Sequence, residues 1–421
     1  MLAGAEGLGR FSAELEDVDV ISSEYTKELC IRGSDAKIVL LVVDGLGGLP
    51  HPATGKSELE TACLPNLDAL AKGGTCGLIS PLGAGFTPGS GPAHLALFGY
   101  DPWQNQIGRG ALSALGLGLD FARGDVAARL NFCTVDAAGR VCDRRAGRIP
   151  TEKGRQLCEV LREIAVPRVE VQVAAEMEYR AGVVLRGASL GDQVSDSDPQ
   201  VTGVPPKPLT ALAPDSERTV EVANAFLEQA AALLADEHPA NMVLLRGFGR
   251  YPELVSMDEA YALKALGIAG YPMYRGVAGA VGMDVEEVGW DLESEFALLE
   301  SRYADYDFFY VHAKKTDSAG EDGDFDLKVR LLEELDTYIP RLIALQPEVL
   351  IVTGDHSTPS IMRSHSWHPV PTVIASQWAL ADATDKFSER GCSAGSLGIA
   401  PATSLMAHAL AHARRLDKFG A

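Results

Sequence analysis

The sequence lacks the excess of basic residues that binding to a nucleic-acid backbone requires. Its 421 residues include 37 lysines and arginines against 58 aspartates and glutamates, which gives a net charge of −21. Because Lys and Arg neutralise phosphate backbones, this balance argues against a broad nucleic-acid surface. A small anionic substrate is not excluded, since a few arginines in a cleft can dominate the local potential.

Paired cysteines and long apolar runs are missing as well. The seven cysteines are odd in number and scattered, and none form a CxxC pair, which favours free thiols in a reducing cytosol over a disulfide framework or a zinc ribbon. No apolar run is long enough for a membrane helix, and the first segment, MLAGAEGLGRFSAELEDVDV, is too acidic for a signal peptide. We therefore predict a cytoplasmic protein without nucleic-acid or membrane partners; the oligomeric state stays open.

A chain of this length is expected to form two domains. The aliphatic run Ile38–Val43 predicts a buried central strand. Strand–helix alternation returns far downstream, in FFYVHA and VLIVTGDHS, whereas the intervening segment has its own strands and a long amphipathic helix. We therefore predict an α/β core built from residues 1–109 and 257–421, with residues 1–36 as an extension. Residues 110–256 are predicted to form an inserted, smaller α/β domain that binds the substrate.

Chemically competent side chains follow two of the predicted strands. Asp44 ends the first strand and precedes a glycine-rich turn, and Asp355-His356 follows VLIVTG. In an open α/β sheet, residues just past the carboxyl ends of strands line the ligand crevice. Taken alone, Asp44 is more often a helix cap or turn residue, and Asp355-His356 could simply orient a loop, but together they indicate metal binding.

A second candidate ligand set follows the strand FFYV. Asp317 and Glu321 are four residues apart, so one helical turn would place both carboxylates on the same side. Two such carboxylates repel unless a cation lies between them. A solvated acidic turn remains the alternative. Further along, His365 and His368 are both plausible ligands, and the sequence does not choose between them.

Ser90 lies between two glycines, with Pro92 just inside a predicted helix. The glycines expose the hydroxyl, and the amides at the helix start would stabilise a phosphate placed on it. A serine is a weak nucleophile until a metal or base activates it. An N-cap serine is the alternative, and it becomes less plausible as the other candidate ligands accumulate.

Basic residues are grouped in the predicted insertion, although the chain as a whole is acidic. The guanidinium fork of arginine suits carboxylate and phosphate groups, so the grouping indicates an anion site. Some of these side chains will instead form surface ion pairs of small energetic weight. The candidates in these segments are Arg129, Asn131, Arg140, Arg144, Arg145, Arg148, Arg246 and Arg250.

Together these motifs resemble the cofactor-independent phosphoglycerate mutases, specifically the archaeal-type branch, within the alkaline phosphatase superfamily. The resemblance spans roughly residues 38–405 and follows the family's order. Its motifs are VVDGLGG, LPNLDALA, TPGSGPAHLALFGYDP, GRGALSALG, NFCTVDAAGRVCDRRAGRI, SDSDPQVTG, RGFG, YPMYRGVAGAVGM, KKTDSAGEDGDF, TGDHSTP and HSWHPVP.

The resemblance implies an alkaline-phosphatase-like mixed sheet sandwiched by helices, with an inserted domain that grips the substrate. It also implies interconversion of 3- and 2-phosphoglycerate, in glycolysis and gluconeogenesis, through a phosphoserine on Ser90 and without added bisphosphoglycerate. Two divalent ions would assist: Mn²⁺ or Mg²⁺, with Zn²⁺ or Co²⁺ as alternatives. By resemblance, one metal is held by Asp44, Ser90, Asp355 and His356, and the other by Asp317, Glu321 and His365.

The resemblance further assigns the anion contacts and a proton-transfer candidate, Asp136. The implied anion clamps are Arg129, Asn131, Arg144, Arg148, Arg246 and Lys314. Two positions depart from the family pattern, because Glu321 and Gln200 stand where the family usually has histidine. Glutamate is a harder ligand than histidine, so we predict a shift toward manganese or magnesium.

Two other functions remain open from the sequence. One is a related phosphotransferase or phosphohydrolase of the same superfamily, such as a homoserine kinase-like or phosphopentomutase-like enzyme. The other is a catalytically inactive metal-binding protein. A mutase must hold free glycerate between its two half-reactions, whereas a hydrolase lets water take the phosphate. The fate of the enzyme-bound phosphate therefore separates the candidates.

Overall fold

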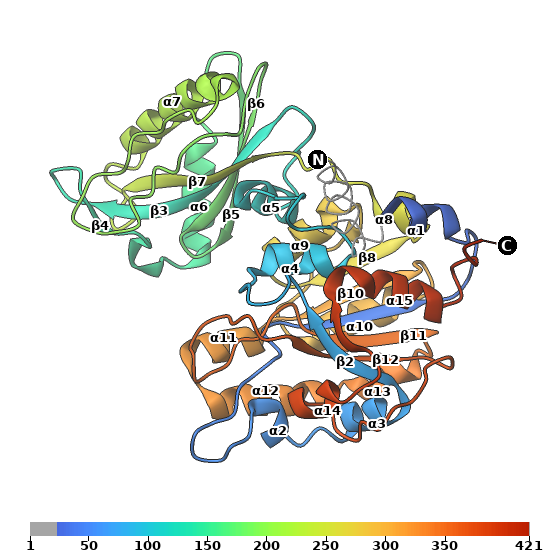
Figure 1. The fold of residues 1–421 in the computed structure, drawn as a ribbon. Coiled ribbons are helices and arrows are strands. Elements are labelled where there is room, and N and C mark those ends of the chain that lie inside the picture. The colour runs from blue at the N-terminus through green and yellow to red at the C-terminus, as the bar shows by residue number, and fades with distance from the viewer. Residues whose placement is uncertain (1–22, 421) are drawn as a thin grey trace, which may run out of the picture. The chain divides into compact units, whose positions relative to one another are not determined.

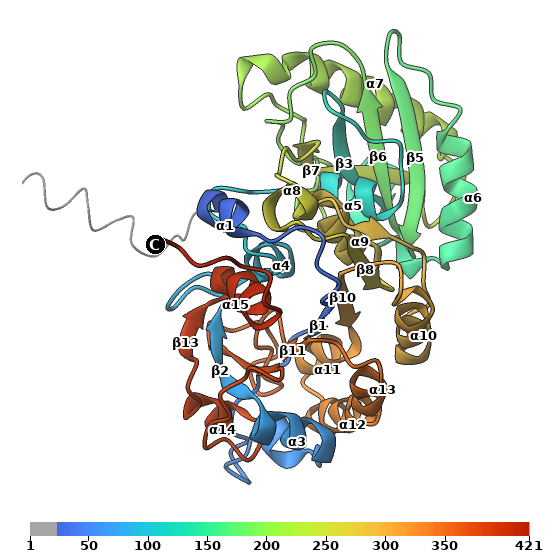
Figure 2. The ribbon, with the colours of Figure 1, turned by 90° about the vertical axis from the view of Figure 1, so that its right-hand side faces the viewer.

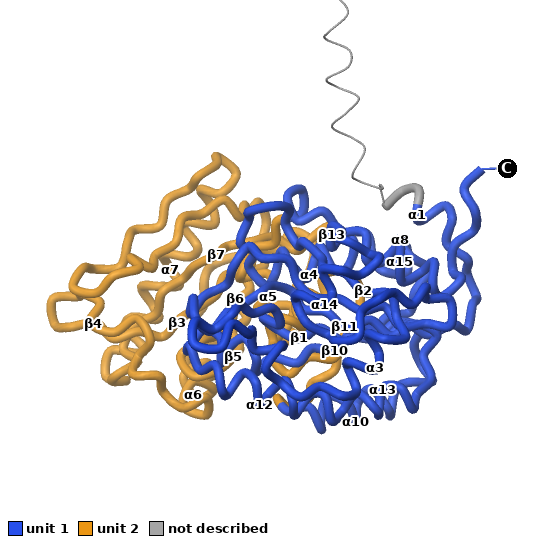
Figure 3. Tube along the Cα trace, turned by 60° about the horizontal axis from the view of Figure 1, so that its bottom comes forward, with its two compact units in different colours: residues 1–105, 255–266, 291–421 blue, residues 106–254, 267–290 orange. Residues whose placement is uncertain are grey.

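The computed structural model describes residues 23–420 and divides them into two compact units, coloured separately in Figure 3. Unit 1 contains the described residues up to Asn105, together with 255–266 and those from Asp291 onward. Unit 2 contains residues 106–254 and 267–290. Most of the expected N-terminal extension, residues 1–22, lies outside the described part of the chain.

Unit 1 is built on a mixed sheet whose central strand is β1 (Ile38–Val43). The six strands of this sheet that lie wholly in unit 1 run in the order β13-β2-β12-β11-β1-β10. Strand β1 pairs in parallel with β10 on one side and β11 on the other, while β12 is antiparallel to both β11 and β2. The other strands are β2 (Thr75–Ser80), β10 (Phe308–Ala313), β11 (Val349–Thr353), β12 (Val370–Ala375) and β13 (Gly398–Pro401).

Helices cover both faces of this sheet. In Figures 1 and 2, α3, α12 and α13 lie on one side of the strands and α4 and α15 on the other. All six residues of β1 and of β10 are buried, as two covered faces require. The helices of unit 1 are α1 (Ser23–Leu29), α2 (Glu58–Thr61), α3 (Pro65–Gly73), α4 (Ser90–Leu97), α8 (Met257–Tyr261), α10 (Leu292–Arg302), α11 (Lys315–Asp322), α12 (Phe325–Asp336), α13 (Ile339–Ala344), α14 (Glu389–Ser393) and α15 (Leu405–His412). The expected α/β class, a mixed sheet sandwiched by helices, is therefore confirmed.

Unit 2 has its own antiparallel sheet and core. Strand β3 pairs with β4, β6 and β7, and β6 pairs with β5. The amphipathic helix α7 packs its buried face, including Phe226, against one side of the sheet, together with α6. The strands are β3 (Val126–Val135), β4 (Val141–Asp143), β5 (Glu170–Met177), β6 (Arg180–Arg186) and β7 (Met242–Arg250); the helices are α5 (Arg109–Gly116), α6 (Thr151–Leu161), α7 (Glu217–Leu233) and α9 (Pro272–Ala280).

The segment 267–290 is assigned differently from the sequence-based expectation. We expected it in the core with the rest of 257–421, but it clusters with unit 2, where α9 packs against α5. Glycines make this close packing possible, because a Cβ on Gly276 would lie 2.0 Å from the carbonyl oxygen of Leu112. A Cβ on Gly116 would lie 1.8 Å from the carbonyl oxygen of Pro272. Strand β8 (Ala265–Ala269) crosses from one unit to the other, and β9 (Asp284–Val285) belongs to unit 2.

The segment 325–344 forms two helices rather than one. The chain turns after α12 and begins α13 at Ile339, with Pro340 in its first turn. Proline lacks the amide that a helix interior needs but fits a helix start. Over the described residues, none of the helices has both the length and the apolarity needed to cross a membrane.

Candidate metal and group-transfer site

Three parallel strands deliver the candidate ligands to one edge of the sheet of unit 1. Asp44 directly follows β1, Lys314 directly follows β10, and Asp355 comes two residues after β11. Strands β10 and β11 are both in register with β1, so their carboxyl ends meet at the same edge. The sequence-based expectation that these segments converge is met in the structure.

The first group of candidate ligand atoms comes from Asp44, Asp355 and His356, which are fully buried and whose ligand atoms lie within 4.8 Å of one another. His356 Nε2 is 3.4 Å from Asp44 Oδ1 and 3.2 Å from Asp355 Oδ2. Ser90, the first residue of α4, places its Oγ 3.3 Å from His356 Nε2. The hydroxyl therefore touches one of the candidate ligands of the first group.

Nearby cations hold the carboxylates of this group in their ionised form. Burial raises the pKa of Asp44, but Lys314, His312 and His356 outweigh it and hold that pKa well below its usual range. Burial lowers the pKa of His356, yet the surrounding carboxylates, Asp355 first, raise it to about 9. A positive charge is thus strongly favoured at this position.

A second group of ligand atoms comes from Asp317, His356 and His365, again within 4.8 Å of one another. The rings of His356 and His365 are stacked with centroids 3.6 Å apart. Asp317 lies in the first turn of α11, and its Oδ1 is 3.5 Å from His365 Nε2. His365 is held from its other ring nitrogen, since Nδ1 is 2.9 Å from the carbonyl oxygen of Pro88.

Glu321 lies at the margin of the second group. Its Oε1 is 3.7 Å from His365 Nε2, but its side chain is 54% exposed and it belongs to neither set of clustered ligand atoms. His368 is held apart from both sets, with its Nδ1 3.1 Å from Ser366 Oγ. Between the two histidines that the sequence left open, the geometry favours His365.

Thr358 connects the two groups and defines which nitrogen of His356 faces them. Its Oγ1 donates a hydrogen bond to Asp317 Oδ1 at 2.9 Å, so its lone pair accepts from His356 Nδ1, also at 2.9 Å. In a neutral imidazole that arrangement leaves Nε2 with a lone pair. Nε2 is the atom that points to Asp44, Asp355 and Ser90.

Lys314 also joins the two groups. Its Nζ lies 2.9 Å from Asp44 Oδ2 and 2.6 Å from Asp317 Oδ2. Burial lowers the pKa of Lys314, but the two carboxylates outweigh it and raise that pKa above its ordinary value. The ammonium therefore supplies positive charge between the two sets of carboxylates. Its assignment as an anion clamp stays a prediction.

Two buried histidines behind the site were not singled out from the sequence. His94 Nδ1 is 2.7 Å from the carbonyl oxygen of Ser90 and 3.6 Å from Asp355 Oδ2, and His312 Nε2 is 3.4 Å from Asp44 Oδ2. Burial lowers the pKa of His94 to about 4. One signal could have found it, because His94 lies four residues after Ser90 and so one helical turn away.

The residues present fit a divalent cation. Asp355 Oδ2 is buried and has no hydrogen-bond partner within the described residues, although two imidazoles approach it. A buried carboxylate oxygen without a hydrogen bond costs stability unless a cation compensates it. Carboxylate and imidazole donors suit manganese, magnesium and zinc.

In unit 2, the candidate anion-binding residues begin with Arg129 and Asn131 on β3. Arg129 is buried, and its Nη2 donates to both carboxylate oxygens of Glu176, at 2.8 and 3.1 Å. Glu176 also accepts a hydrogen bond from Tyr271. Asn131 Oδ1 is buried without a hydrogen-bond partner among the described residues. Glu176 therefore largely balances the charge of Arg129, while Asn131 retains an open acceptor.

A second set in unit 2 centres on Asp198. Arg144 makes a two-pronged contact with it, at 2.8 and 2.7 Å, and Arg246 Nη1 lies 3.5 Å from the same carboxylate. Gln200, one of the departures from the family pattern, accepts a hydrogen bond from Arg144 at 2.7 Å. Arg148 is apart from this set, with a side chain 60% exposed and 3.7 Å from Glu178.

Asp136 forms the turn between β3 and β4. Its Oδ1 accepts hydrogen bonds from the amides of Ala138 and Arg140, and its Oδ2 accepts one from the Arg140 guanidinium. These hydrogen bonds, those from Arg140 first, lower the pKa of Asp136. Such contacts are typical of a structural turn residue; a role in proton transfer stays a prediction.

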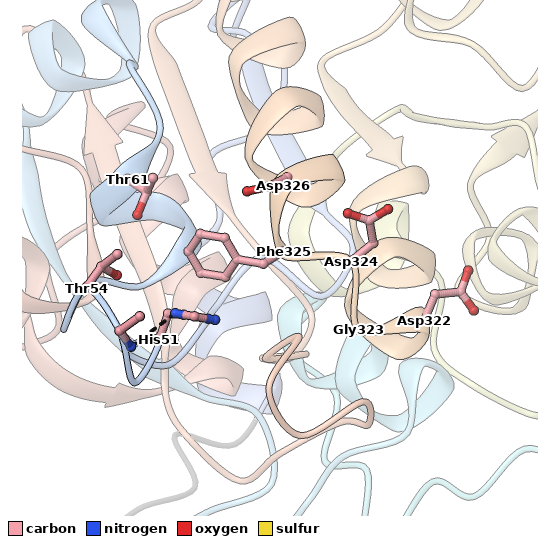
Figure 4. A pocket seen from close by; sticks show the side chains of 9 residues that line it. His51, Thr54, Thr61, Asp322, Gly323, Asp324, Phe325 and Asp326 are labelled. Carbon is pink, nitrogen blue, oxygen red and sulfur yellow. Dashed lines mark hydrogen bonds between the residues drawn. The ribbon is translucent and has the colours of Figure 1, made fainter.

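A pocket of about 580 Å³ in unit 1 contains none of the candidate ligands (Figure 4). Its lining residues come from the loop before α2, the end of α2, the end of α11 and the start of α12. His51 and Phe325 lie against each other with ring centroids 5.2 Å apart. Asp322, Asp324 and Asp326 give it an acidic rim. Unit 2 has a pocket of about 620 Å³ beside Arg155, Glu176 and Trp290.

The fold and this cluster define an α/β protein with a candidate metal site beside a serine hydroxyl. A family model described as 2,3-bisphosphoglycerate-independent phosphoglycerate mutase matches residues 71–241. A probable 2,3-bisphosphoglycerate-independent phosphoglycerate mutase of Thermus thermophilus is 49% identical over 94% of this chain and 98% of its own. A probable 2,3-bisphosphoglycerate-independent phosphoglycerate mutase of Aquifex aeolicus is 45% identical over 96% of this chain and 100% of its own.

Solved structures agree with these relatives. A cofactor-independent phosphoglycerate mutase from Thermoplasma acidophilum superposes with a TM-score of 0.69 at 31% identity, covering 90% of this chain and all of that one. A protein of Pyrococcus horikoshii superposes with a TM-score of 0.80 at 30% identity, covering 92% of this chain and all of that one. The chain belongs to the family of 2,3-bisphosphoglycerate-independent phosphoglycerate mutases.

Proposed function

We propose that this protein is an isomerase that interconverts 3-phosphoglycerate and 2-phosphoglycerate through a phosphoserine on Ser90, without added bisphosphoglycerate. The observation that carries the proposal is the position of Ser90 Oγ, 3.3 Å from His356 Nε2 in a buried carboxylate–imidazole cluster. Family membership supplies the reaction, and this contact supplies a residue to carry the phosphate.

In the first half-reaction, the hydroxyl of Ser90 gives up its proton and Oγ attacks the phosphorus of the substrate. The bond from phosphorus to one glycerate hydroxyl oxygen breaks, and that oxygen takes a proton. In the second half-reaction the other hydroxyl gives up a proton and attacks the phosphorus of the phosphoserine. The bond from phosphorus to Ser90 Oγ breaks, and Oγ takes a proton to restore the hydroxyl. The amides at the start of α4 would stabilise the serine-bound phosphate, because helix N-termini carry partial positive charge. Asp136 is our candidate for proton transfer.

We propose two divalent metal ions, Mn²⁺ or Mg²⁺ before Zn²⁺ or Co²⁺. One would be held by Asp44, Ser90, Asp355 and His356, and the other by Asp317, Glu321 and His365. When bound, such ions activate a hydroxyl as a nucleophile and stabilise charge on a transferring phosphoryl group. The two clusters that share His356 support a pair of adjacent ions.

We also propose that unit 2 binds the substrate and retains glycerate between the half-reactions. The contacts would come from Arg129, Asn131, Arg144, Arg148 and Arg246, with Lys314 contributing from unit 1. The open acceptor of Asn131 could receive a glycerate hydroxyl. Arginine forks would bind the carboxylate and the phosphate. Such a reaction serves glycolysis and gluconeogenesis, and seven free cysteines support a cytoplasmic location.

The proposal is tested by coupling the protein to enolase with 3-phosphoglycerate as substrate and no bisphosphoglycerate. We expect phosphoenolpyruvate to form at a rate proportional to the concentration of the protein. Protein stripped of metal with chelator before the assay should give no product, and Mn²⁺ added back to it should restore the rate. Substrate labelled in its phosphate should release less than a few per cent of the label as inorganic phosphate. Release of most of the label would instead identify a phosphohydrolase.

A further inference from the structure

Unit 1 contains a lysine with no solvent exposure, Lys328, on α12. Its Nζ donates three hydrogen bonds to backbone carbonyls: to Gly45 at 2.8 Å, to Gly47 at 3.0 Å and to Thr358 at 2.9 Å. An ammonium group has three donors, so all of them are used. A fully buried lysine is rare in proteins unless specific partners hold it.

The three acceptors belong to the two loops that carry candidate ligands. Gly45 and Gly47 follow Asp44 in the loop after β1, whereas Thr358 lies in the loop after β11, two residues from His356. The loops also touch directly, because the amide of Gly45 donates to Asp355 Oδ1 at 3.1 Å. Lys328 therefore links loops that are about three hundred residues apart in the chain and joined in the site.

Two glutamates, Glu58, which is buried, and Glu389, which is half-buried, accompany this ammonium and reach the same loops. Glu58 accepts hydrogen bonds from the amide and hydroxyl of Ser360, at 2.8 and 2.6 Å, and Glu389 accepts one from the amide of Gly48 at 2.7 Å. Burial lowers the pKa of Lys328, and Glu58 and then Glu389 oppose this effect. Each member of the trio thus contacts a ligand loop through the backbone.

We propose that Lys328 is a positioning residue that holds the loops bearing Asp44 and Asp355-His356 in the geometry required for metal binding and phosphoryl transfer. The inference rests on the proposed function for its catalytic part. Its metal-binding part stands on the geometry alone. Lys328 contacts neither a candidate ligand side chain nor Ser90 through a hydrogen bond, so it acts through the backbone of the two loops.

The test compares the whole protein with the variant Lys328→Met, which has a similar length but no donor or charge. Chelator-treated protein is titrated with Mn²⁺ alone in a calorimeter, and kcat and KM are measured at saturating Mn²⁺. We expect Mn²⁺ affinity and kcat each to fall 10- to 100-fold, the range typical of lost partners around metal ligands, with KM changed less than threefold.

Arg415→Met is the matched control, since Arg415 is another buried cation of unit 1 that donates to backbone carbonyls, those of Ser34 and Ala36. We expect it to lower the melting temperature while leaving Mn²⁺ affinity and kcat per folded molecule unchanged. Lys328→Gln keeps two hydrogen-bond donors and replaces Lys328→Met in the test if that variant does not fold. We expect Lys328→Gln to lower Mn²⁺ affinity and kcat threefold to tenfold each.

Mn²⁺ affinity and kcat within twofold of wild type in the folded Lys328 variants would overturn the inference, as would equal losses in the Arg415 control. These outcomes are distinct from a failure of the proposed function. If the unaltered protein has no mutase activity, the function is wrong, and the Mn²⁺ titration still decides whether Lys328 positions the ligand loops.

Discussion

At the scale of single residues, the site depends on side chains that each serve two partners. Thr358 donates to Asp317 and accepts from His356, and Lys314 bridges Asp44 and Asp317. Removing one such group leaves a buried partner unsatisfied, which costs more than the contact itself contributes. Substitutions that remove a single functional group are therefore informative about the site.

Removing the hydroxyl of Ser90 tests its assignment as the phosphate carrier. We expect Ser90→Ala to abolish turnover in the enolase-coupled assay, because no other group would accept the phosphate, and to leave the melting temperature within a few degrees of wild type. Ser393→Ala, at an exposed serine, is the control and should keep full activity. Residual mutase activity above about one per cent of wild type in Ser90→Ala would reject the phosphoserine mechanism.

Glu321→His introduces the histidine that the family resemblance leads us to expect at this position. Imidazole is a softer ligand than carboxylate, so we expect metal preference to shift away from Mn²⁺ and toward Zn²⁺ or Co²⁺. The measurement is the activity of chelator-treated protein reconstituted with each metal in turn. Asp322→His places the same group one residue further along and should not change the order of metals. An unchanged order in Glu321→His would show that Glu321 does not bind metal.

At the scale of helices and strands, places where the backbones of two elements lie close together determine which substitutions the protein tolerates. Helix α9 offers a matched pair of glycines, because a Cβ on Gly276 would meet the carbonyl of Leu112 at 2.0 Å, whereas one on Gly279 would meet no atom within 4 Å. The two residues occupy the same helix and differ mainly in whether α5 lies against them.

We expect Gly276→Ala to destabilise the protein by about 1–3 kcal/mol, because α5 and α9 must separate to admit the methyl group. Gly279→Ala should instead stabilise it by about 0.5–1 kcal/mol, since alanine favours the helix. Chemical denaturation of both variants checks the pair. Equal effects in the two variants would mean that α5 and α9 are not packed as described.

Asp382 connects β2 to the segment before β13, because its carboxylate accepts hydrogen bonds from the amides of Cys76, Ser396 and Thr384. Burial raises its pKa, but these amides outweigh burial and lower it to about 2. A depressed folded-state pKa contributes stability that is present above the unfolded value near 4 and is lost as pH falls through about 2.

We therefore expect Asp382→Asn to lower the free energy of unfolding by about 1–2 kcal/mol at pH 7. The difference from wild type should disappear as the pH approaches 2. Denaturation curves between pH 7 and pH 2 make the measurement. Asp385→Asn, three residues further along at an exposed position, should change stability little at any pH. A pH-independent deficit in Asp382→Asn would assign the effect to lost packing rather than to charge.

Element-scale prediction from the sequence succeeded where one physical rule dominated. The run Ile38–Val43 forms a strand with those bounds because six buried aliphatic residues favour a two-sided central strand. Segment 267–290 was assigned to the wrong unit because the apolar spacing of α9 indicates that one face of the helix is buried, but not which helix covers that face. His94 and Lys328 were missed for a similar reason, since their partners are fixed only by tertiary contacts.

At the scale of the whole molecule, the two units carry separate parts of the proposed chemistry. The candidate metal-binding carboxylates and imidazoles lie in unit 1, and the candidate anion-binding arginines all lie in unit 2. If metal is held only by unit 1, its effect on local stability should be confined there. Ligand binding slows local opening of the elements that contact the ligand.

Hydrogen exchange of the chelated protein, with and without Mn²⁺, tests this division. We expect added Mn²⁺ to slow exchange at least tenfold in residues 44–48 and 354–360, because these loops carry candidate ligands. The exchange rates of the amides of β5 and β6 should be unchanged. The same experiment with Mg²⁺ in place of Mn²⁺ provides a comparison. Slower exchange in β5 and β6, without slowing in the two loops, would place the metal elsewhere.

The strand order of unit 1 has a consequence for biosynthesis. Strand β1 pairs only with β10 and β11, which the ribosome makes after the whole of residues 106–254. At a synthesis rate of roughly 5–20 residues per second, the apolar strand β1 remains without its partner strands for on the order of tens of seconds. The β3–β7 sheet of unit 2 is complete by Arg250, so it can form before the metal cluster, whose ligands extend to His365.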